Sequence, residues 1–232
     1  MTITITAMKW APPFAAGNVR DHRVRWILNE VGWPYQVRLI DAADLASEDY
    51  RAKQPFGQVP YIEEDGRPTL FETGAIVIDV ATRAKQLIPE EEGDRALVLT
   101  WLVAALNSIE PSLMNVAEVE YFLDDEEQKR VRRPLVLQAA NRRLEQLQGA
   151  LGEQQFLVGE GFTIADLMTA SVLKIARNLD LLSSFSRLLA YQNRCLDRPA
   201  YRKAVDDQRA NIAAHTSKDM KYAEAESING RH

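Results

Sequence analysis

The spacing of apolar positions changes along the chain from the period of a strand to that of a helix. Ile3, Ile5 and Ala7 alternate with threonines, and this period of two predicts a strand with β-branched residues on both faces. Residues 35–40 predict a second strand, and apolar positions three and four apart over residues 19–31 predict a helix between them. We expect this strand–helix–strand unit to be parallel, with a right-handed crossover.

The following segment predicts a short helix, a hairpin and a closing helix. Residues 44–53 predict a short polar helix. Strands near residues 61–63 and 69–71 flank an Asp-Gly turn, which is typical of a hairpin. A helix over residues 74–86 completes this part of the chain. Taken together, these elements predict an α/β domain.

Beyond residue 86 the pattern is helical. Residues 87–93 combine a proline, a charge run and a glycine, which predicts a linker between an α/β domain (1–86) and an all-α domain (94–215). A kink is expected at Pro111. Residues 216–232 form a polar tail, either loose or draped over a cleft. Three helices show apolar stripes that we assign to the core: Leu97, Trp101, Ala104 and Ser108; Leu137, Ala140, Leu144, Leu147 and Leu151; Ala165, Met168, Val172, Ile175 and Leu179.

Composition narrows the classes of partner. A net charge of −5 argues against nucleic acid as the main partner. The single cysteine, Cys195, excludes internal disulfides and fits a reducing compartment, and its setting near a helix end favours a packed thiol over a nucleophile. The sequence shows neither a signal peptide nor an apolar segment of about 18 residues, so we expect a soluble, cytoplasmic chain with no membrane partner.

Residues 54–60 (QPFGQVP) and the residues that open the next helix contain the candidate binding chemistry. Pro60 precedes a strand and cannot donate to its ladder, so it stands at the first position, where a cis Val59–Pro60 bond would turn the Val59 amide and carbonyl outward. Glu72 offers an acceptor for an ammonium group, and Thr73 at the helix start offers donors for a carboxylate. These groups predict a receptor for a small zwitterionic peptide.

This arrangement resembles the thioredoxin-like domain of the glutathione S-transferases. The helical part adds residues 162–166 (FTIAD), which resemble the family's cap in the second domain, and residues 198–201 (RPAY), which resemble its late turn. The cap also has a plain folding role, since a hydroxyl precedes an acid by three residues. The resemblance implies a glutathione transferase fold: a thioredoxin-like α/β domain followed by an all-α domain.

The same resemblance assigns roles to the binding residues. It implies that Val59 and Pro60 bind the cysteinyl backbone of glutathione, and that Glu72 and Thr73 bind its γ-glutamyl end. Gln58 matches a position that reaches the glycyl carboxylate, and Gln54 assists it. The alternatives are solvated loop amides for the two glutamines, an ordinary N-terminal acid for Glu72 and an ordinary cap for Thr73.

Thiol activation is where the chain departs from the family pattern. The family places a hydroxyl or thiol donor after the first strand, whereas residues 10–21 contain no Tyr, Ser, Thr or Cys. Asn18 stands where related classes have a catalytic serine, and Arg20 follows two residues later, so both are candidate catalytic residues. Asn18 is equally suited to cap the first helix with Asp21 at the third position.

The cations that follow have two interpretations. Arg20, His22, Arg23 and Arg25 oppose the dipole of a helix N-terminus, so either an anionic ligand lies nearby or they coat a surface or subunit contact. We interpret His22 as solvated or structural.

We therefore expect a glutathione transferase that uses glutathione as co-substrate and attaches its thiolate to a hydrophobic electrophile, with peroxide reduction as a variant. We expect no metal site, and a homodimer joined along the third helix of the small domain and the first of the helical one. The rival is a non-catalytic glutathione-binding or scaffold protein. The expected electrophile site is lined by Trp10, Phe14, Leu106, Ile109, Met114 and Tyr121.

Overall fold

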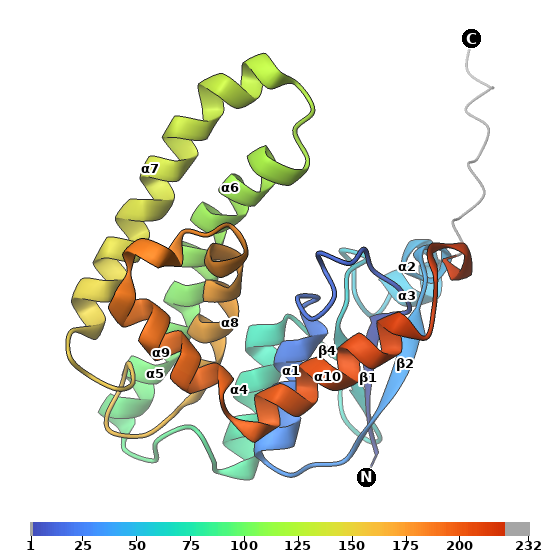
Figure 1. Cartoon of the computed structure of the whole chain (residues 1–232). Helices are drawn as coiled ribbons and strands as arrows, with labels where there is room; N and C mark the ends of the chain where they lie inside the picture. Colours follow the sequence, from blue (N-terminus) through green and yellow to red (C-terminus); the bar gives the residue numbers. More distant parts are fainter. Residues whose placement is uncertain (1, 221–232) are drawn as a thin grey trace. The chain divides into compact units, whose positions relative to one another are not determined.

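Four strands form one mixed sheet in the order β2-β1-β3-β4 in the computed structural model, which describes residues 2–220 (Figure 1). The strands are β1 (Ile3–Met8), β2 (Tyr35–Ile40), β3 (Tyr61–Glu64) and β4 (Leu70–Phe71). β1 and β2 are parallel, as the sequence predicts, and β3 pairs antiparallel with both β1 and β4. The predicted hairpin is therefore confirmed.

Contacts group the described residues into two units, one containing the sheet and one helical. The sheet unit runs to Ile76 and resumes at Lys203, and the helical unit is Val77–Arg202. The helices of the sheet unit are α1 (Asp21–Glu30), α2 (Ala42–Ala46), α3 (Glu48–Arg51), the start of α4 (Thr73–Ala84), most of α10 (Pro199–Ala213) and the short η3 (Ser217–Asp219).

The C-terminal helix α10 belongs to a different unit from the one that the sequence indicates. The expected bounds assign residues 94–215 to the helical domain, but from Lys203 onward the chain groups with the sheet. Polar side chains of α10 explain this grouping, because Gln208 and Asn211 hydrogen-bond to groups in and just before α1. Of the expected tail, residues 216–220 form η3 and its cap, and the remainder lies outside the described residues.

The helical unit is built around α8 (Ile164–Asn178), which is buried on nearly every face. It packs against α5 (Glu92–Ala104), α6 (Glu110–Tyr121) and α9 (Ser186–Leu196). The long α7 (Glu126–Leu151) runs beside α6 (Figure 1). A short 3-10 turn, η2 (Leu182–Ser184), separates α8 from α9.

Two of the three predicted core stripes are confirmed, and the third is wrong. On α7, Ala140, Leu144, Leu147 and Leu151 are buried and Leu137 is half-buried. The stripe on α8 has Ala165, Met168 and Val172 buried, with Ile175 and Leu179 half-buried. On α5 the expected stripe begins at Leu97, which is 52% exposed. The stripe one residue further on is buried instead, and it has the same helical spacing: Val98, Leu102, Ala105 and Ile109. Helical periodicity alone does not separate two adjacent apolar stripes.

The helix containing Pro111 widens at the position where the sequence predicts a kink. A π-helical turn, η1 (Ala105–Ile109), joins α5 to α6, and the Glu110 amide bonds to the carbonyl of Ala105, five residues back. Pro111 then stands in the first turn of α6, where an amide hydrogen is not needed.

The run Glu92–Tyr121, which comprises α5, η1 and α6, corrects one sequence expectation. It contains an 18-residue window of mean hydropathy 1.4, so by length and composition it is the one helix among residues 2–220 that could cross a membrane. An apolar segment of that length therefore exists. This is weak evidence for a span, because core helices meet the same criterion, and this run packs against α7 and α8.

Candidate functional site

The segment over residues 54–60 is fixed by side chains beneath it and leaves part of its main chain open. Gln54 is 2% exposed, and its Oε1 accepts the Gln58 amide at 3.1 Å. The Val59–Pro60 bond is cis. Within residues 2–220, no hydrogen bond joins the Val59 amide or carbonyl to another residue. Val59 therefore has one main-chain donor and one main-chain acceptor that no described residue engages.

Glu72 and Thr73 meet at the start of α4. Glu72 is exposed and has a φ of 66°, and its carbonyl accepts the Ile76 amide at 3.0 Å. A positive φ is costly for a residue with a Cβ, and such residues cluster at ligand sites. Thr73 is 5% exposed, and Arg23 Nη1 donates to its Oγ1 at 3.5 Å. An exposed carboxylate thus stands next to a hydroxyl that is held by a guanidinium.

Asn18 does not cap α1, which corrects one of the two interpretations of this residue. Its Nδ2 donates to the Phe14 carbonyl at 3.1 Å, within the loop. The N-cap position is Arg20, whose backbone is already helical and whose side chain makes no capping bond. The chain turns into the helix with bonds to carbonyls three residues back, from His22 to Val19 and from Arg23 to Arg20. The Asn18 side chain therefore stabilises the loop before α1, where it is half-buried.

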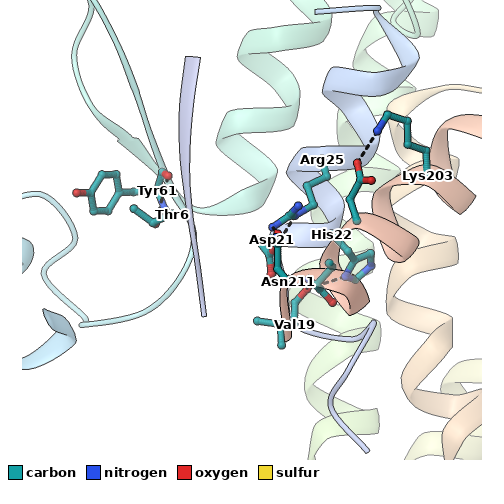
Figure 2. A network of polar contacts seen from close by, with 10 residues as sticks. Thr6, Val19, Asp21, His22, Arg25, Tyr61, Lys203 and Asn211 are labelled. Carbon is teal, nitrogen blue, oxygen red and sulfur yellow. Dashed lines mark hydrogen bonds and ion pairs between the residues drawn. The ribbon is translucent and has the colours of Figure 1, made fainter. Parts of the chain in front are cut away.

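Three of the four cations near this helix start lie inside the protein, so the interpretation as a surface coat is wrong for them. His22, Arg23 and Arg25 are 2%, 3% and 1% exposed, whereas Arg20 is exposed. His22 Nδ1 donates to the Val19 carbonyl at 2.8 Å, which supports the structural interpretation of this histidine (Figure 2).

Asp21 is the counter-charge that makes the burial of Arg25 possible. Arg25 Nε lies 2.7 Å from Asp21 Oδ2, and Arg25 Nη2 donates to Asn211 Oδ1 at 2.9 Å (Figure 2). Burial raises the pKa of the Asp21 carboxyl above its ordinary value, although the guanidinium of Arg25 and the amide of Gln208 oppose the rise. The expected role of Asp21 as a capping acid is therefore replaced by a buried ion pair.

The residues expected to line an electrophile site are divided between the two units. In the sheet unit, Trp10 is half-buried and Phe14 is 58% exposed. In the helical unit, Leu106 is half-buried, while Met114 and Tyr121 are exposed.

Ile109 and Tyr121 have contacts of their own within the helical unit. Ile109 is 5% exposed and belongs to the core. Tyr121 Oη donates to the Asn178 carbonyl at 3.2 Å. The burial of Ile109 is therefore explained by packing in the core, without a substrate.

The remaining candidate groups have folding roles, as the sequence indicates. Thr163 and Asp166 form the predicted capping box at the start of α8. Asp166 also accepts hydrogen bonds from the Leu157 amide at 2.9 Å and from Tyr191 Oη at 3.0 Å. Cys195 is fully buried, and burial raises the pKa of its thiol far above the usual range. The prediction of a packed, unreactive thiol is consistent with both facts.

Two residues close to this site are ones that sequence reasoning missed. Tyr50 Oη donates to the Gln58 carbonyl at 2.8 Å, and Thr6 Oγ1 accepts the Tyr61 amide at 2.9 Å. The sequence pattern assigns Thr6 only to a strand and Tyr50 only to a polar helix. No local signal reports these contacts, because each partner is distant in sequence or hidden in a loop.

Comparisons with known proteins agree with this fold. The family model of the glutathione S-transferase N-terminal domain matches residues 14–79, and that of the C-terminal domain matches residues 109–199. Glutathione S-transferase F14 of Arabidopsis thaliana is 26% identical over 195 residues, which cover 77% of this chain and 76% of that protein.

Solved structures share the fold. A glutathione transferase from Burkholderia graminis, with two glutathione molecules bound per subunit, superposes with a TM-score of 0.77 at 23% identity and covers 88% of both chains. Ure2p in complex with glutathione gives a TM-score of 0.76 at 19% identity, covering 88% of this chain and 93% of that one.

The fold and the site together define a class of protein in which a thioredoxin-like α/β domain precedes a helical region. Within that class, the two family models together match about two thirds of the chain, and the chain belongs to the glutathione S-transferase family.

Proposed function

We propose that this protein is a glutathione transferase that joins the thiolate of glutathione to the electrophilic carbon of a hydrophobic substrate. A carbon–sulfur bond forms and the leaving group departs with its electron pair. Reduction of organic peroxides through the same thiolate is a variant of this chemistry. Such an activity would serve in detoxification.

The observation that supports the proposal most is the open main chain of Val59. A donor and an acceptor on one residue, next to the exposed carboxylate and buried hydroxyl of Glu72 and Thr73, match the peptide and the amino-acid end of glutathione. In the proposed complex, Val59 pairs with the cysteinyl backbone as a neighbouring strand would. Glutathione is also the ligand found in the related solved structures.

Other polar groups would complete the site. Glu72 would receive the γ-glutamyl ammonium, and Thr73, backed by Arg23, would bind the adjacent carboxylate. Gln58, whose side chain is exposed, would reach the glycyl carboxylate. Gln54 would act through Gln58, because its side chain is buried and holds the Gln58 amide.

We propose that Asn18 and Arg20 stabilise the glutathione thiolate. Asn18 Nδ2 has two hydrogens and uses one of them on the Phe14 carbonyl, so the second is free to donate. Arg20 is exposed at the N-cap of α1 and would add positive charge to the helix start.

The proposal also covers the residues that bind the electrophile, the surface that forms a homodimer and the cellular compartment. In the sheet unit, Trp10 and Phe14 are the residues that would contact an apolar substrate. In the helical unit, Leu106, Met114 and Tyr121 are the candidate apolar contacts, and Ile109 lies in the core. Leu97 and Val103 leave apolar surface on α5, which would contribute with α4 to a homodimer. The single buried thiol suits a cytoplasmic protein.

A non-catalytic glutathione-binding or scaffold protein is the second candidate. One observation favours it: residues 10–21 contain no hydroxyl or thiol donor, and the Asn18 amide is already engaged within its loop. Such a protein would keep the peptide site and lack turnover.

Calorimetric titration with glutathione and turnover assays with an activated aryl halide and an organic peroxide test the proposal. We expect wild-type binding, and at least about tenfold weaker binding for both Glu72→Gln and Thr73→Ala, since each removes a partner of a charged group. Matched controls on exposed positions of the helical unit, Glu153→Gln and Thr100→Ala, should bind like wild type.

Turnover separates the two candidates. Binding without turnover of either substrate would favour the scaffold. If Arg20→Ala abolishes activity and Asn18→Ala leaves the pH dependence of turnover unchanged, Arg20 rather than Asn18 is the main group that stabilises the thiolate. Unchanged glutathione affinity in Glu72→Gln and Thr73→Ala would show that these two residues do not bind the γ-glutamyl end.

A further inference from the structure

We infer that Thr6 and Tyr50 are positioning residues that hold the peptide-binding segment Gln58–Tyr61 in its binding geometry. Neither residue would touch glutathione. The inference rests on the proposed function, because it concerns how the open Val59 main chain is kept in place. Four observations support it, and each involves contacts within the sheet unit.

The first observation is the way the β1–β3 ladder ends. Its last pair is Ile5 with Ile62, so Thr6 lies opposite Tyr61, and the preceding residue, Pro60, has no amide hydrogen to continue the ladder. Beyond the last pair, a side chain replaces the main chain as the acceptor on β1: Thr6 Oγ1 accepts the Tyr61 amide at 2.9 Å (Figure 2).

The second observation fixes the direction of the remaining bonds. Tyr50 has one hydroxyl proton, and it goes to the Gln58 carbonyl at 2.8 Å, since a carbonyl can only accept. The Thr6 and Tyr50 oxygens are 3.2 Å apart, so Thr6 must be the donor between them. Its other acceptor, the Tyr61 carbonyl, is more distant at 3.4 Å.

These bonds form one directed chain: the Tyr61 amide donates to Thr6, Thr6 to Tyr50, and Tyr50 to the Gln58 carbonyl. The two ends of this chain lie on the residues that flank Val59 and Pro60. Bonds that run in one direction polarise and strengthen one another.

The third observation is burial. Thr6 is 0% and Tyr50 is 5% exposed, so water cannot easily replace a lost bond. A carbonyl or amide left unpaired here would favour a shift of the backbone toward a new partner. Any such shift moves the Val59 amide and carbonyl, which lie between the two anchored residues.

The fourth observation is that Tyr50 also contacts the segment with its ring. The Tyr50 and Tyr61 ring centroids are 5.0 Å apart, and Val59 packs against the cluster that these rings form with Ile40. Replacing Tyr50 by Phe preserves this packing and removes only the hydroxyl, so it isolates the hydrogen bond.

The test compares Tyr50→Phe, Thr6→Val and Thr6→Ser with wild type in the full chain. Glutathione affinity is measured by calorimetry, and amide exchange at Gln58 and Tyr61 by NMR. We expect Tyr50→Phe and Thr6→Val to raise the Kd about threefold to tenfold, and Thr6→Ser, which keeps the hydroxyl, to remain within about twofold of wild type. Exchange at the Tyr61 amide should accelerate in Thr6→Val and not in Thr6→Ser.

Tyr191→Phe is the matched control for a general loss of stability. Tyr191 is 1% exposed in the helical unit and donates its hydroxyl to Asp166. This variant should lower the melting temperature and leave both the Kd and the two exchange rates unchanged.

The outcomes separate the inference from the proposed function. Wild-type affinity in Tyr50→Phe, or an equal loss of affinity in Tyr191→Phe, would overturn the inference. Unchanged exchange at Gln58 and Tyr61 in Thr6→Val and Tyr50→Phe would also overturn it, whatever the affinity. If exchange changes in Thr6→Val and Tyr50→Phe but the wild type does not bind glutathione, Thr6 and Tyr50 do hold the segment in place and the proposed function is wrong.

Discussion

Asp21 and Arg25 form an ion pair in the first turn of α1, with Arg25 Nε 2.7 Å from Asp21 Oδ2 and each side chain 1% exposed. The C-terminal helix completes the network, because Asn211 accepts from Arg25 and Gln208 Nε2 donates to the Val19 carbonyl at 2.8 Å. A buried ion pair repays its desolvation only when further hydrogen bonds satisfy both groups. These contacts therefore join α10 to the start of α1.

Removing the cation from this pair should be costly. We expect Arg25→Met to lower the free energy of unfolding by about 3–5 kcal/mol, because Asp21 is left buried without its counter-charge. The matched control is Arg202→Met, whose pair with Asp197 is exposed and should contribute less than about 1 kcal/mol. Urea denaturation measures both, and equal losses would contradict a special role for the buried pair.

The same variant should show a characteristic pH dependence. Burial raises the pKa of the Asp21 carboxyl, and Arg25 opposes that rise, so the pKa should climb further in Arg25→Met. A carboxyl whose folded-state pKa exceeds its unfolded value loses stability as the pH rises through the folded pKa. We therefore expect the stability deficit of Arg25→Met to shrink as the pH is lowered from neutral toward the ordinary pKa of a carboxyl group. A deficit of constant size would show that charge burial is not its cause.

Because Glu72 has a positive φ, replacing it with glycine should raise the stability of the protein and weaken glutathione binding. We expect Glu72→Gly to raise the free energy of unfolding by about 0.5–1 kcal/mol, because glycine tolerates a φ of 66° without steric cost. Glutathione binding should weaken by at least about tenfold, since the carboxylate is lost. Asp180→Gly is the control: its φ is 56° in the helical unit, so it should gain stability at unchanged affinity. A stability gain in Asp180→Gly alone would argue against backbone strain at Glu72.

The Cys195 thiol should be inert in the native protein. Burial raises its pKa, and each unit of increase lowers the reactive thiolate fraction about tenfold. We expect an aromatic disulfide reagent to react at least about 100-fold more slowly with native protein than with protein unfolded in urea. Absorbance of the released thiolate gives both rates, and a native rate close to the unfolded one would mean that Cys195 is accessible.

Asp166 should contribute more to stability than a simple cap does. Its carboxylate accepts hydrogen bonds from the Leu157 amide, the Thr163 amide and Tyr191 Oη, all buried. We expect Asp166→Ala to lose at least about 3 kcal/mol, because these donors are left unpaired. Thr163→Ala, which removes only the capping hydroxyl, should lose about 1 kcal/mol. Urea denaturation compares the two, and similar losses would reduce Asp166 to a member of the capping box.

The sequence predicts best where the relevant partners are close along the chain. The strand alternation of β1, the hairpin of β3 and β4 and the capping box of Thr163 and Asp166 all depend on neighbours a few residues apart. The stripe on α5 shows the limit, since Leu97 and Val98 begin equally regular apolar repeats and only packing selects the second. The cap at Asn18 fails for a related reason: tertiary folding begins α1 only after Arg20, so the Asn18 side chain lies in the loop, where it donates to the Phe14 carbonyl.

By itself, the sequence determined the succession of strands and helices in the α/β part, the family resemblance and the motif around Val59 and Pro60, because period, turn chemistry and short motifs are local properties. The tertiary structure decided which groups become partners. It buried Arg25 against Asp21 and brought Asn211, 186 residues away, to the same guanidinium. It also brought Thr6 within hydrogen-bonding distance of Tyr50, 44 residues on, and of Tyr61, 55 residues on. Such contacts form only when folding removes water from side chains far apart in sequence, so no local pattern records them.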